Sequence, residues 1–289
     1  MDGPLLRSAT TAPPDSLGDV FWLCRTCGVE HASAGEVCAI CADERQWVPR
    51  EGQQWAALDE LAAQGMRSQV EVLEEGLLAV GATPRCGIGQ QAKLVCTPGG
   101  NLLWDPSGFL DDAAVAAVAA HGRVIGIAAS HPHMFGAQVE WSRRLGGVPV
   151  YVNAADAGWV MRPDPVIQHW SDTLALTESL RLVRIGGHFP GSAVACWADG
   201  ADGRGVLLTG DTVFPNPDRA TVSFMRSYPN LIPLSGAVVG RMADTLAALT
   251  FDRVYGLFTN AIDADAHQSV QRSAQRYIGW VTGAYDQLT

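Results

Sequence analysis

The chain has 289 residues, of which 47% are hydrophobic, and its 30 acidic and 20 basic residues give a formal net charge of −10. A chain of this length and apolar content can bury a substantial core, and no apolar run approaches the roughly 20 residues that span a bilayer. An acidic protein repels phosphate backbones, so we expect no nucleic-acid partner, no membrane partner and a small-molecule substrate. The first residues lack the pattern of a secretory signal, which makes the cytoplasm the expected location. The composition leaves homo-oligomer formation open.

The amino-terminal part contains a cysteine motif. Residues 1–18, rich in Ser, Thr and Pro, are expected to form a flexible tail. Residues 19–50 hold two Cys-x-x-Cys pairs with ten residues between them, Cys24 with Cys27 and Cys38 with Cys41. Each pair forms a tight turn whose thiolates converge, and two pairs can build one closed tetrahedral metal site. Two redox pairs are the alternative, although thioredoxin-type pairs do not occur in tandem at this spacing.

The residues around these cysteines carry a resemblance. With Trp22 before the first pair, Gly28 just after it and Trp47 beyond the second, the segment resembles the short rubredoxin-like domain of rubrerythrins, and zinc ribbons generally. The resemblance implies one bound metal. Thiolate tetrahedra suit both zinc and iron, so a structural zinc is our first choice and a redox iron remains open.

The elements that follow predict a second, larger domain over residues 76–289. Residues 51–75 are expected to be a linker containing a helix over 55–63. An alanine-rich helix is expected after an antiparallel meander, because "DDAAVAAVAAHG" has an acidic start and a terminal glycine. Strands are expected, in chain order, at 77–80, 91–96, 102–104, 124–129, 148–152, 180–185, 193–197 and 206–208, with helices ending at Arg144 and starting near Ser235. This order predicts a layered α/β sandwich.

Two histidines flank a proline in the stretch "VIGIAASHPHMFG". The strand before them is apolar, and the ends of such strands are where α/β sheets tend to place their sites. In an extended segment residues two apart face the same side, so His131 and His133 can aim at one point with Pro132 restricting the backbone between them. This predicts a metal pair, and a surface turn with two solvated imidazoles is the alternative.

Two later loops supply further candidate ligands. His188 follows a strand and a Gly-Gly turn, where the missing side chains let the backbone approach another loop. Asp211 follows a buried strand in "VLLTGDTVF", which puts its carboxylate beyond the strand end. Each pattern alone is as typical of an ordinary turn as of a ligand.

The order of these motifs resembles the metallo-β-lactamase superfamily, with its glyoxalase-like and general metallo-hydrolase branches nearest, over roughly residues 76–289. The resemblance implies an α/β fold, an αββα sandwich of the metallo-β-lactamase type, here preceded by the small four-cysteine, rubredoxin-like module. It also implies a metal site in which His131, His133, His188 and Asp211 are ligands, and catalytic roles for Asp211, as ligand or general base, and for His133.

This chain departs from the motif of that superfamily, which reads His-x-His-x-Asp-His. Phe135 and Gly136 stand where its last two ligands would be, and Phe258 and Thr259 stand near the place of its final histidine. We therefore expect one metal, zinc or iron, and a lost second site. Because its ligands come from separate loops, we expect this site to keep its metal when the cysteine site is lost.

The substrate-binding residues are expected around this metal. Phe135 is a candidate for an apolar pocket wall. The long segment "PDRATVSFMRSYPNLIP" is expected to form an irregular lid, in which Arg226 and Tyr228 are candidates for contacting an acidic substrate.

Three functions follow from these features. The first is a metal-dependent hydrolase of an ester, thioester or lactone-like bond. The second is a mononuclear non-haem iron oxidoreductase, with the four-cysteine module as a rubredoxin-type electron carrier. The third is a catalytically eroded member of the superfamily, since fold resemblance supports a reaction class only by analogy.

Overall fold

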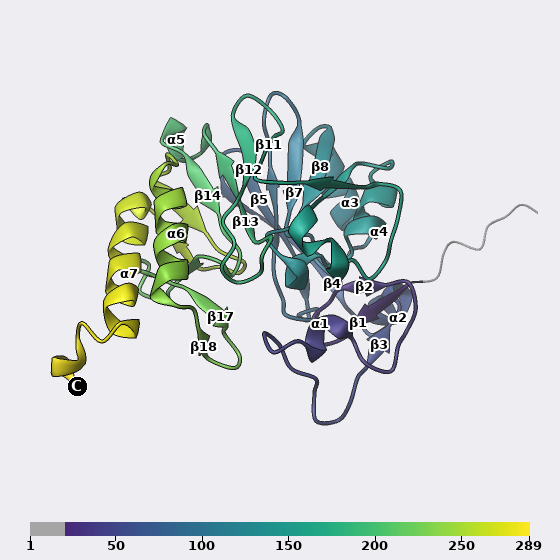
Figure 1. The fold of residues 1–289 in the computed structure, drawn as a ribbon. Coiled ribbons are helices and arrows are strands. Elements are labelled where there is room, and N and C mark those ends of the chain that lie inside the picture. Colours follow the sequence, from purple (N-terminus) through teal and green to yellow (C-terminus); the bar gives the residue numbers. More distant parts are fainter. Residues whose placement is uncertain (1–20) are drawn as a thin grey trace, which may run out of the picture.

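The structure is a computed structural model that describes residues 21–289. The predicted tail, residues 1–18, lies outside the described residues. Two β-sheets pack face to face, and helices cover both outer faces (Figure 1). This four-layer arrangement is the αββα sandwich that the sequence predicts. In residues 21–289 no helix is both long enough and apolar enough to cross a membrane.

The first sheet has seven strands in the order β10-β9-β8-β7-β6-β5-β4. Strands β5 to β7 form the predicted antiparallel meander, which β4 extends by one strand, and β7 to β10 run parallel to one another. The parallel strands bring the residues after Trp104 and Ala128 to the same edge. The strands are β4 (Arg67–Glu74), β5 (Leu77–Thr83), β6 (Ala92–Val95), β7 (Asn101–Trp104), β8 (Val124–Ala128), β9 (Val150–Asn153) and β10 (Ile167–Trp170).

The second sheet has six strands in the order β11-β12-β13-β14-β19-β20. Its strands pair antiparallel except for β14 with β19, which are parallel. The strands are β11 (Thr173–Ala175), β12 (Leu180–Arg184), β13 (Ala193–Trp197), β14 (Val206–Leu208), β19 (Arg253–Tyr255) and β20 (Ala261–Ile262).

Three apolar clusters correspond to the interfaces between layers. The cluster between the sheets contains Trp104 from the first sheet and Trp197 from the second. The second sheet is covered by α6 (Gly236–Ala247) and α7 (Ala266–Val281), whose buried residues form another cluster (Figure 1). The first sheet is covered by α3 (Asp112–Ala120), α4 (Gln138–Arg144) and the amino-terminal module.

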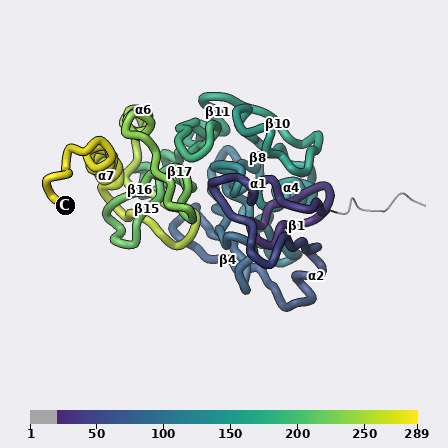
Figure 2. Tube along the Cα trace, turned by 60° about the horizontal axis from the view of Figure 1, so that its bottom comes forward, coloured from purple at the N-terminus to yellow at the C-terminus, as the bar shows by residue number. Residues whose placement is uncertain are grey.

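The amino-terminal module packs against the outer face of the first sheet, beside α4 (Figure 2). Its four cysteines are buried in the same apolar cluster as Leu78 and Leu94 of that sheet. Backbone contact is tight, because a Cβ atom on Gly108 would lie 2.4 Å from the carbonyl oxygen of Gly28. The module contains β1 (Trp22–Cys24), β2 (Glu30–His31), α1 (Ala39–Ala42) and β3 (Trp55–Ala56), and is followed by α2 (Leu58–Ala63).

Two segments differ from the sequence-based expectation. Part of the expected linker, Arg67–Glu74, is the edge strand β4, which pairs with β5. The alternation of apolar and polar residues that predicts a strand is weak in β4, because most of its residues are exposed, including Val72. The start of the expected linker helix, Trp55–Ala56, is instead strand β3, which pairs with β1 and extends the module beyond residue 50, so the helix begins at Leu58. The expected irregular lid contains two short hairpins, formed by β15 (Phe214–Pro215) with β16 (Val222–Ser223) and β17 (Met225–Ser227) with β18 (Ile232–Pro233). The remaining short helical segments are η1 (Pro132–Met134), η2 (Ala154–Trp159), α5 (Gly200–Gly203) and η3 (Asp286–Leu288).

Candidate metal centre

Four side chains that the sequence singles out meet at one edge of the sandwich. His131 and His133 follow β8, His188 lies between β12 and β13, and Asp211 follows β14. One potential ligand atom from each lies within 4.8 Å of the others. The imidazoles are buried, and the Asp211 side chain is 15% exposed, so the cluster reaches solvent at its carboxylate. In residues 21–289 this is one of two clusters of metal-ligating residues.

The His-Pro-His turn has a different backbone from the one expected. His131 is extended, with φ −169°, but Pro132 opens a 3-10 turn that includes His133. Proline suits the first position of a helical turn because its φ is already fixed near −65°. The two imidazole centroids are 5.1 Å apart, so a turn brings the rings together where we expected an extended segment to do so.

The Gly-Gly turn before His188 allows a close approach, as the sequence predicts, but to helix α6 and not to another loop. Gly187 has φ +85°, and a Cβ atom there would lie 2.5 Å from the sulfur of Met242 in α6. The absent side chain therefore lets the loop pack against α6. His188 then lies with its ring centroid 4.7 Å from that of His131.

Burial sets the charge state of the imidazoles. It lowers the pKa of His133 well below its usual range, helped by the charges of His131 and His188. Burial and His131 also lower the pKa of His188, to about 3. For Asp211, burial acts to raise the pKa, but the His131 imidazole, whose Nε2 lies 3.4 Å from Asp211 Oδ2, outweighs it and the pKa is lowered. The result is neutral imidazoles at His133 and His188 beside an ionised Asp211 carboxylate, and neutral imidazole and ionised carboxylate are the states that ligate metals.

Unpartnered nitrogen atoms show that the cluster suits a cation. The Nε2 atoms of His131 and His133 are buried without a hydrogen-bond partner. Leaving such an atom unpaired costs about 1–3 kcal/mol. Two other nitrogens have the partners usual in metal sites, with His188 Nδ1 3.1 Å from the carbonyl oxygen of Met225 and His131 Nδ1 2.9 Å from Ser130 Oγ. The remaining pair, His188 Nε2 and His133 Nδ1, lie 3.4 Å apart. The donor set of imidazoles and a carboxylate fits zinc or iron(II).

Further residues support these ligands, and of these the sequence reasoning missed Asp105 and Arg45. Asp105 accepts a hydrogen bond at 2.6 Å from the backbone N–H of Ser130, and both residues are buried. The signal for Asp105 was its place directly after a strand, in "NLLWDPSG". Phe189, which follows His188, contacts all three imidazoles at centroid distances of 4.9–5.8 Å. Arg45 of the amino-terminal module lies over the Phe189 ring, 4.0 Å from its centroid.

The four cysteines form the second cluster. Sγ of Cys24 is 3.6 Å from that of Cys41, and Sγ of Cys27 is 3.8 Å from that of Cys38. A tetrahedron with metal–sulfur bonds of about 2.3 Å requires sulfur–sulfur separations of about 3.8 Å. Gln53 Nε2 donates to Cys24 Sγ at 3.2 Å, and His31 Nε2 lies 3.4 Å from Cys38 Sγ. The cluster is consistent with the predicted zinc-ribbon module.

The predicted substrate-binding residues have other contacts. Phe135 is 3% exposed and packs in the apolar cluster of the module and the first sheet, which is the position of a packing residue. Arg226 donates to Glu44 of the module at 2.5 Å. The Tyr228 hydroxyl lies 3.2 Å from the carbonyl oxygen of Asp211, and burial raises its pKa well above the usual range. Tyr228 therefore anchors the Asp211 backbone.

An aromatic cluster adjoins Tyr228, whose hydroxyl contacts the backbone of Asp211. The Phe214 ring lies 4.9 Å from that of Tyr228 and 6.4 Å from that of Phe258, centroid to centroid. All three side chains are partly exposed. Phe214 was missed because nothing in its local sequence distinguishes it from a core residue.

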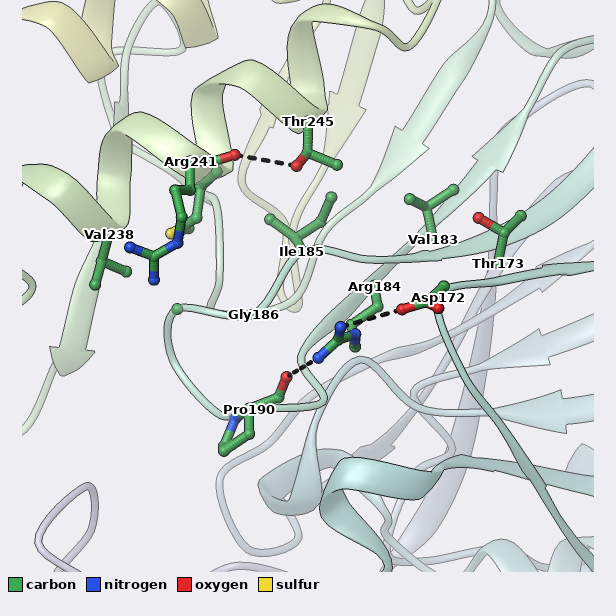
Figure 3. A pocket seen from close by; sticks show the side chains of 12 residues that line it. Asp172, Thr173, Val183, Arg184, Ile185, Gly186, Pro190, Val238, Arg241 and Thr245 are labelled. Carbon is green, nitrogen blue, oxygen red and sulfur yellow. Dashed lines mark hydrogen bonds and ion pairs between the residues drawn. The ribbon is translucent and has the colours of Figure 1, made fainter.

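A surface pocket lies behind the loop that carries His188. It has a volume of about 550 Å³ and is walled by the Gly186–Gly187 turn, Arg184 and Arg241 (Figure 3). Arg184 donates to the carbonyl oxygen of Pro190 at 3.5 Å and to Asp172 at 3.1 Å (Figure 3). The loop is thus contacted on this side by an exposed arginine and on its other side by the buried Arg45.

Comparisons with known proteins agree with the fold. The chain is 41% identical over 263 residues to the Bacillus subtilis protein "Uncharacterized protein YmaE". The match covers 89% of this chain and 96% of that one. Three solved structures of metallo-β-lactamases are similar in fold. A B3 enzyme with an active-site glutamic acid has a TM-score of 0.52 and 13% identity, and the match covers 80% of this chain and 96% of that one. DIM-1 has a TM-score of 0.55 and 14% identity, with 73% of this chain and 98% of that one covered. FIM-1 from Pseudomonas aeruginosa in its mono-zinc form has a TM-score of 0.51 and 13% identity, with 72% of this chain and 95% of that one covered. No protein-family model matches the chain.

Proposed function

The chain belongs to the family of Bacillus subtilis YmaE and has the metallo-β-lactamase fold, and on this basis we propose that it is a metal-dependent hydrolase that cleaves an ester, thioester or lactone-like bond of a small molecule with a single metal. The observation that supports this most is the convergence of three buried imidazoles and one partly exposed carboxylate, with the Nε2 atoms of His131 and His133 unpartnered.

In this proposal His131, His133, His188 and Asp211 hold the metal. A divalent metal supplies Lewis acidity, which polarises a carbonyl oxygen and makes water a better nucleophile near neutral pH. Zinc is our first choice, because three imidazoles and one carboxylate suit its usual coordination. The cysteine module holds a second, structural ion of the same kind.

The catalytic roles in the proposal fall to Asp211 and His133. The Asp211 carboxylate is partly exposed, so one of its oxygens can accept a proton from water at the open side of the centre. Its Oδ2 atom lies 3.4 Å from His131 Nε2, which keeps the carboxylate aligned with the imidazoles. Tyr228 holds the Asp211 backbone through its hydroxyl. The low pKa of His133 keeps its imidazole available as a ligand.

The surroundings of Asp211 suggest the kind of substrate. Phe214, Tyr228 and Phe258 form an aromatic wall next to the loop that carries Asp211. Such a wall favours a substrate that carries an apolar group next to the scissile bond.

A second candidate function, a mononuclear iron oxidoreductase, is favoured by one observation. The cysteine module contacts the loop that carries a ligand of the His/Asp centre, because Arg45 of the module donates a hydrogen bond of 2.7 Å to the carbonyl oxygen of His188. Two iron sites so placed could exchange electrons. An iron–S₄ module is coloured as purified, whereas a zinc module is colourless.

The test begins with metal analysis of anaerobically purified protein. The hydrolase proposal expects two zinc ions per chain, no colour, and turnover of an ester, thioester or lactone panel that is lost in His131→Ala. The matched control is His169→Ala, because His169 is exposed on β10. Two iron ions and a red colour would support the oxidoreductase. A His/Asp centre that takes up neither metal would overturn both and identify an eroded member.

A further inference from the structure

Arg45 connects the cysteine module to the His/Asp centre. Its Nε atom donates a hydrogen bond of 2.7 Å to the backbone carbonyl oxygen of His188. Its guanidinium lies 4.0 Å from the centroid of the Phe189 ring. The side chain is 7% exposed, so this contact is formed away from water. A hydrogen bond from a charged, buried donor is among the stronger ones in proteins.

Phe189 carries this contact to the ligands. Its ring lies against the imidazoles of His131, His133 and His188. Arg45 therefore fixes both the backbone of one ligand and the aromatic ring that packs against all three. Groups that orient ligands in this way affect metal affinity although they do not touch the ion.

Arg45 is itself held on two sides. Within the module, its Nη1 atom donates to Asp43 at 2.6 Å. The β17–β18 hairpin, labelled in Figure 1, supplies the other side. Ser227 Oγ donates to the carbonyl oxygen of Arg45 at 3.1 Å, and Asn230 Nδ2 donates to the carbonyl oxygens of Glu44 and Gln46 at 2.9 Å. The guanidinium can hold its position only while this short segment keeps its conformation.

The conformation of that segment depends on the cysteine cluster. Arg45 follows the last cysteine of the cluster, Cys41, by four residues, and the helix α1 begins directly after Cys38. A module of this size, with strands of two or three residues, depends on its metal for folding. Loss of the metal from the cysteine site would therefore release Arg45.

We propose that Arg45 is a positioning residue through which the cysteine module sets the metal affinity of the His/Asp centre. This replaces the expectation from sequence that the two sites are independent because their ligands come from separate loops. The inference rests on the proposed function in one respect, that the His/Asp centre binds a metal.

The test uses the full chain, stripped of metal and titrated with Co²⁺ alone. Cobalt in the cysteine site gives sulfur-to-metal charge-transfer bands in the near ultraviolet, which the His/Asp centre lacks because it has no sulfur ligand. Cobalt in the His/Asp centre is the total bound cobalt less the amount that these bands report, so each site is followed separately. Arg45→Met, which keeps much of the packing volume, should weaken Co²⁺ binding at the His/Asp centre by about 10- to 100-fold. Its charge-transfer bands should stay at full intensity, which shows that the module is folded.

The matched control is Arg184→Met. Arg184 also donates to a carbonyl oxygen of the His188 loop, that of Pro190, but from solvent. Arg184→Met should bind Co²⁺ as the wild type does. Arg45→Lys keeps the charge but not the planar guanidinium donor. Its Co²⁺ affinity at the His/Asp centre should lie between those of the wild type and Arg45→Met.

A double-mutant cycle tests the route of the coupling. Cys38→Ser should also weaken Co²⁺ binding at the His/Asp centre, and adding Arg45→Met to it should weaken binding little further, because both act through one contact. Equal affinities of Arg45→Met and Arg184→Met would overturn the inference and leave the proposed function intact. Absence of Co²⁺ from the His/Asp centre of the wild type would instead overturn the proposed function. If Cys38→Ser does not fold, the comparison of Arg45→Met with Arg184→Met still decides.

Discussion

A Cβ atom on Gly136 would lie 2.0 Å from the carbonyl oxygen of Pro106. Gly136 has φ +49°, and its own carbonyl oxygen accepts a hydrogen bond from the N–H of Glu30 in the cysteine module. This is the position at which the His-x-His-x-Asp-His motif would have a histidine for a second metal. The backbone at Gly136 packs closely between the loop after β7 and the module, so there is no room for a side chain at this position.

We therefore predict that Gly136→His does not create a second metal site. The left-handed backbone and the contact with Pro106 should together lower the free energy of unfolding by about 2–5 kcal/mol. Gly136→Ala should lower it by a similar amount, because the Cβ atom is the cause. Metal analysis and denaturant unfolding of both variants check this. An additional metal ion per chain in Gly136→His, with unchanged stability, would contradict it.

The sequence predicted those parts of the molecule that local patterns determine. The strand ranges at 193–197 and 206–208 agree with β13 and β14, because these strands are buried along their whole length and read as continuous apolar runs. The four residues of the His/Asp centre were found because each directly follows a strand or a turn whose end can be read from glycines or proline. The αββα arrangement came from the family resemblance together with the order of elements.

The parts that sequence reasoning missed depend on contacts between distant residues. Strand β4 is stabilised by pairing with β5 while its exposed residues show no apolar stripe. Arg45 and His188 are 143 residues apart, and nothing near Arg45 in the sequence indicates that it reaches a ligand. Phe135 was assigned to the substrate pocket from its place in the motif, whereas tertiary packing directs it into the core of the module.

The contact between the module and the first sheet gives a second prediction. Gly108→Ala introduces a Cβ atom 2.4 Å from the carbonyl oxygen of Gly28, which should force the module away from the sheet and lower stability by about 1–3 kcal/mol. A chelator should then extract metal from the cysteine site faster than in the wild type. Gly158→Ala is the control, because nothing lies within 4 Å of the added atom. Equal rates of metal extraction from Gly108→Ala and Gly158→Ala would show that the close approach of Gly108 to Gly28 does not stabilise the cysteine site.

The support behind His131 gives a third prediction. Ser130 Oγ lies 2.9 Å from His131 Nδ1, and Asp105 holds the Ser130 backbone. Ser130→Ala should weaken metal binding at the His/Asp centre by about tenfold or more, because the ring loses the partner that orients it. Competition with a chromophoric chelator measures this. Ser142→Ala is a fitting comparison, since its buried hydroxyl donates to Val148 away from the centre and its loss should leave metal affinity unchanged.

The last prediction concerns Lys93, which is the single lysine of the chain and is 1% exposed. Its Nζ atom donates to the carbonyl oxygens of Gln91 at 3.0 Å and Phe258 at 3.4 Å. Burial lowers its pKa from 10.5 to about 8, while Asp105 and Glu71 act in the opposite direction. A charged Lys93 therefore destabilises the folded state below pH 8, where the amine is protonated in both the folded and the unfolded chain.

Between pH 8 and 10.5 the folded protein releases the Lys93 proton while the unfolded chain keeps it. Because the unfolded chain then binds more protons, the contribution of Lys93 to the free energy of unfolding rises with pH. Measured against Lys93→Met, which cannot titrate, the wild type should gain about 2 kcal/mol between about pH 7.5 and about pH 10. Urea unfolding of both proteins across this range measures the difference. No other lysine contributes in the window, and the tyrosines and cysteines are common to both proteins. A difference that stays constant, or that falls as the pH rises, would mean that Lys93 keeps an ordinary pKa and that the interior beside Asp105 is more hydrated than its burial indicates.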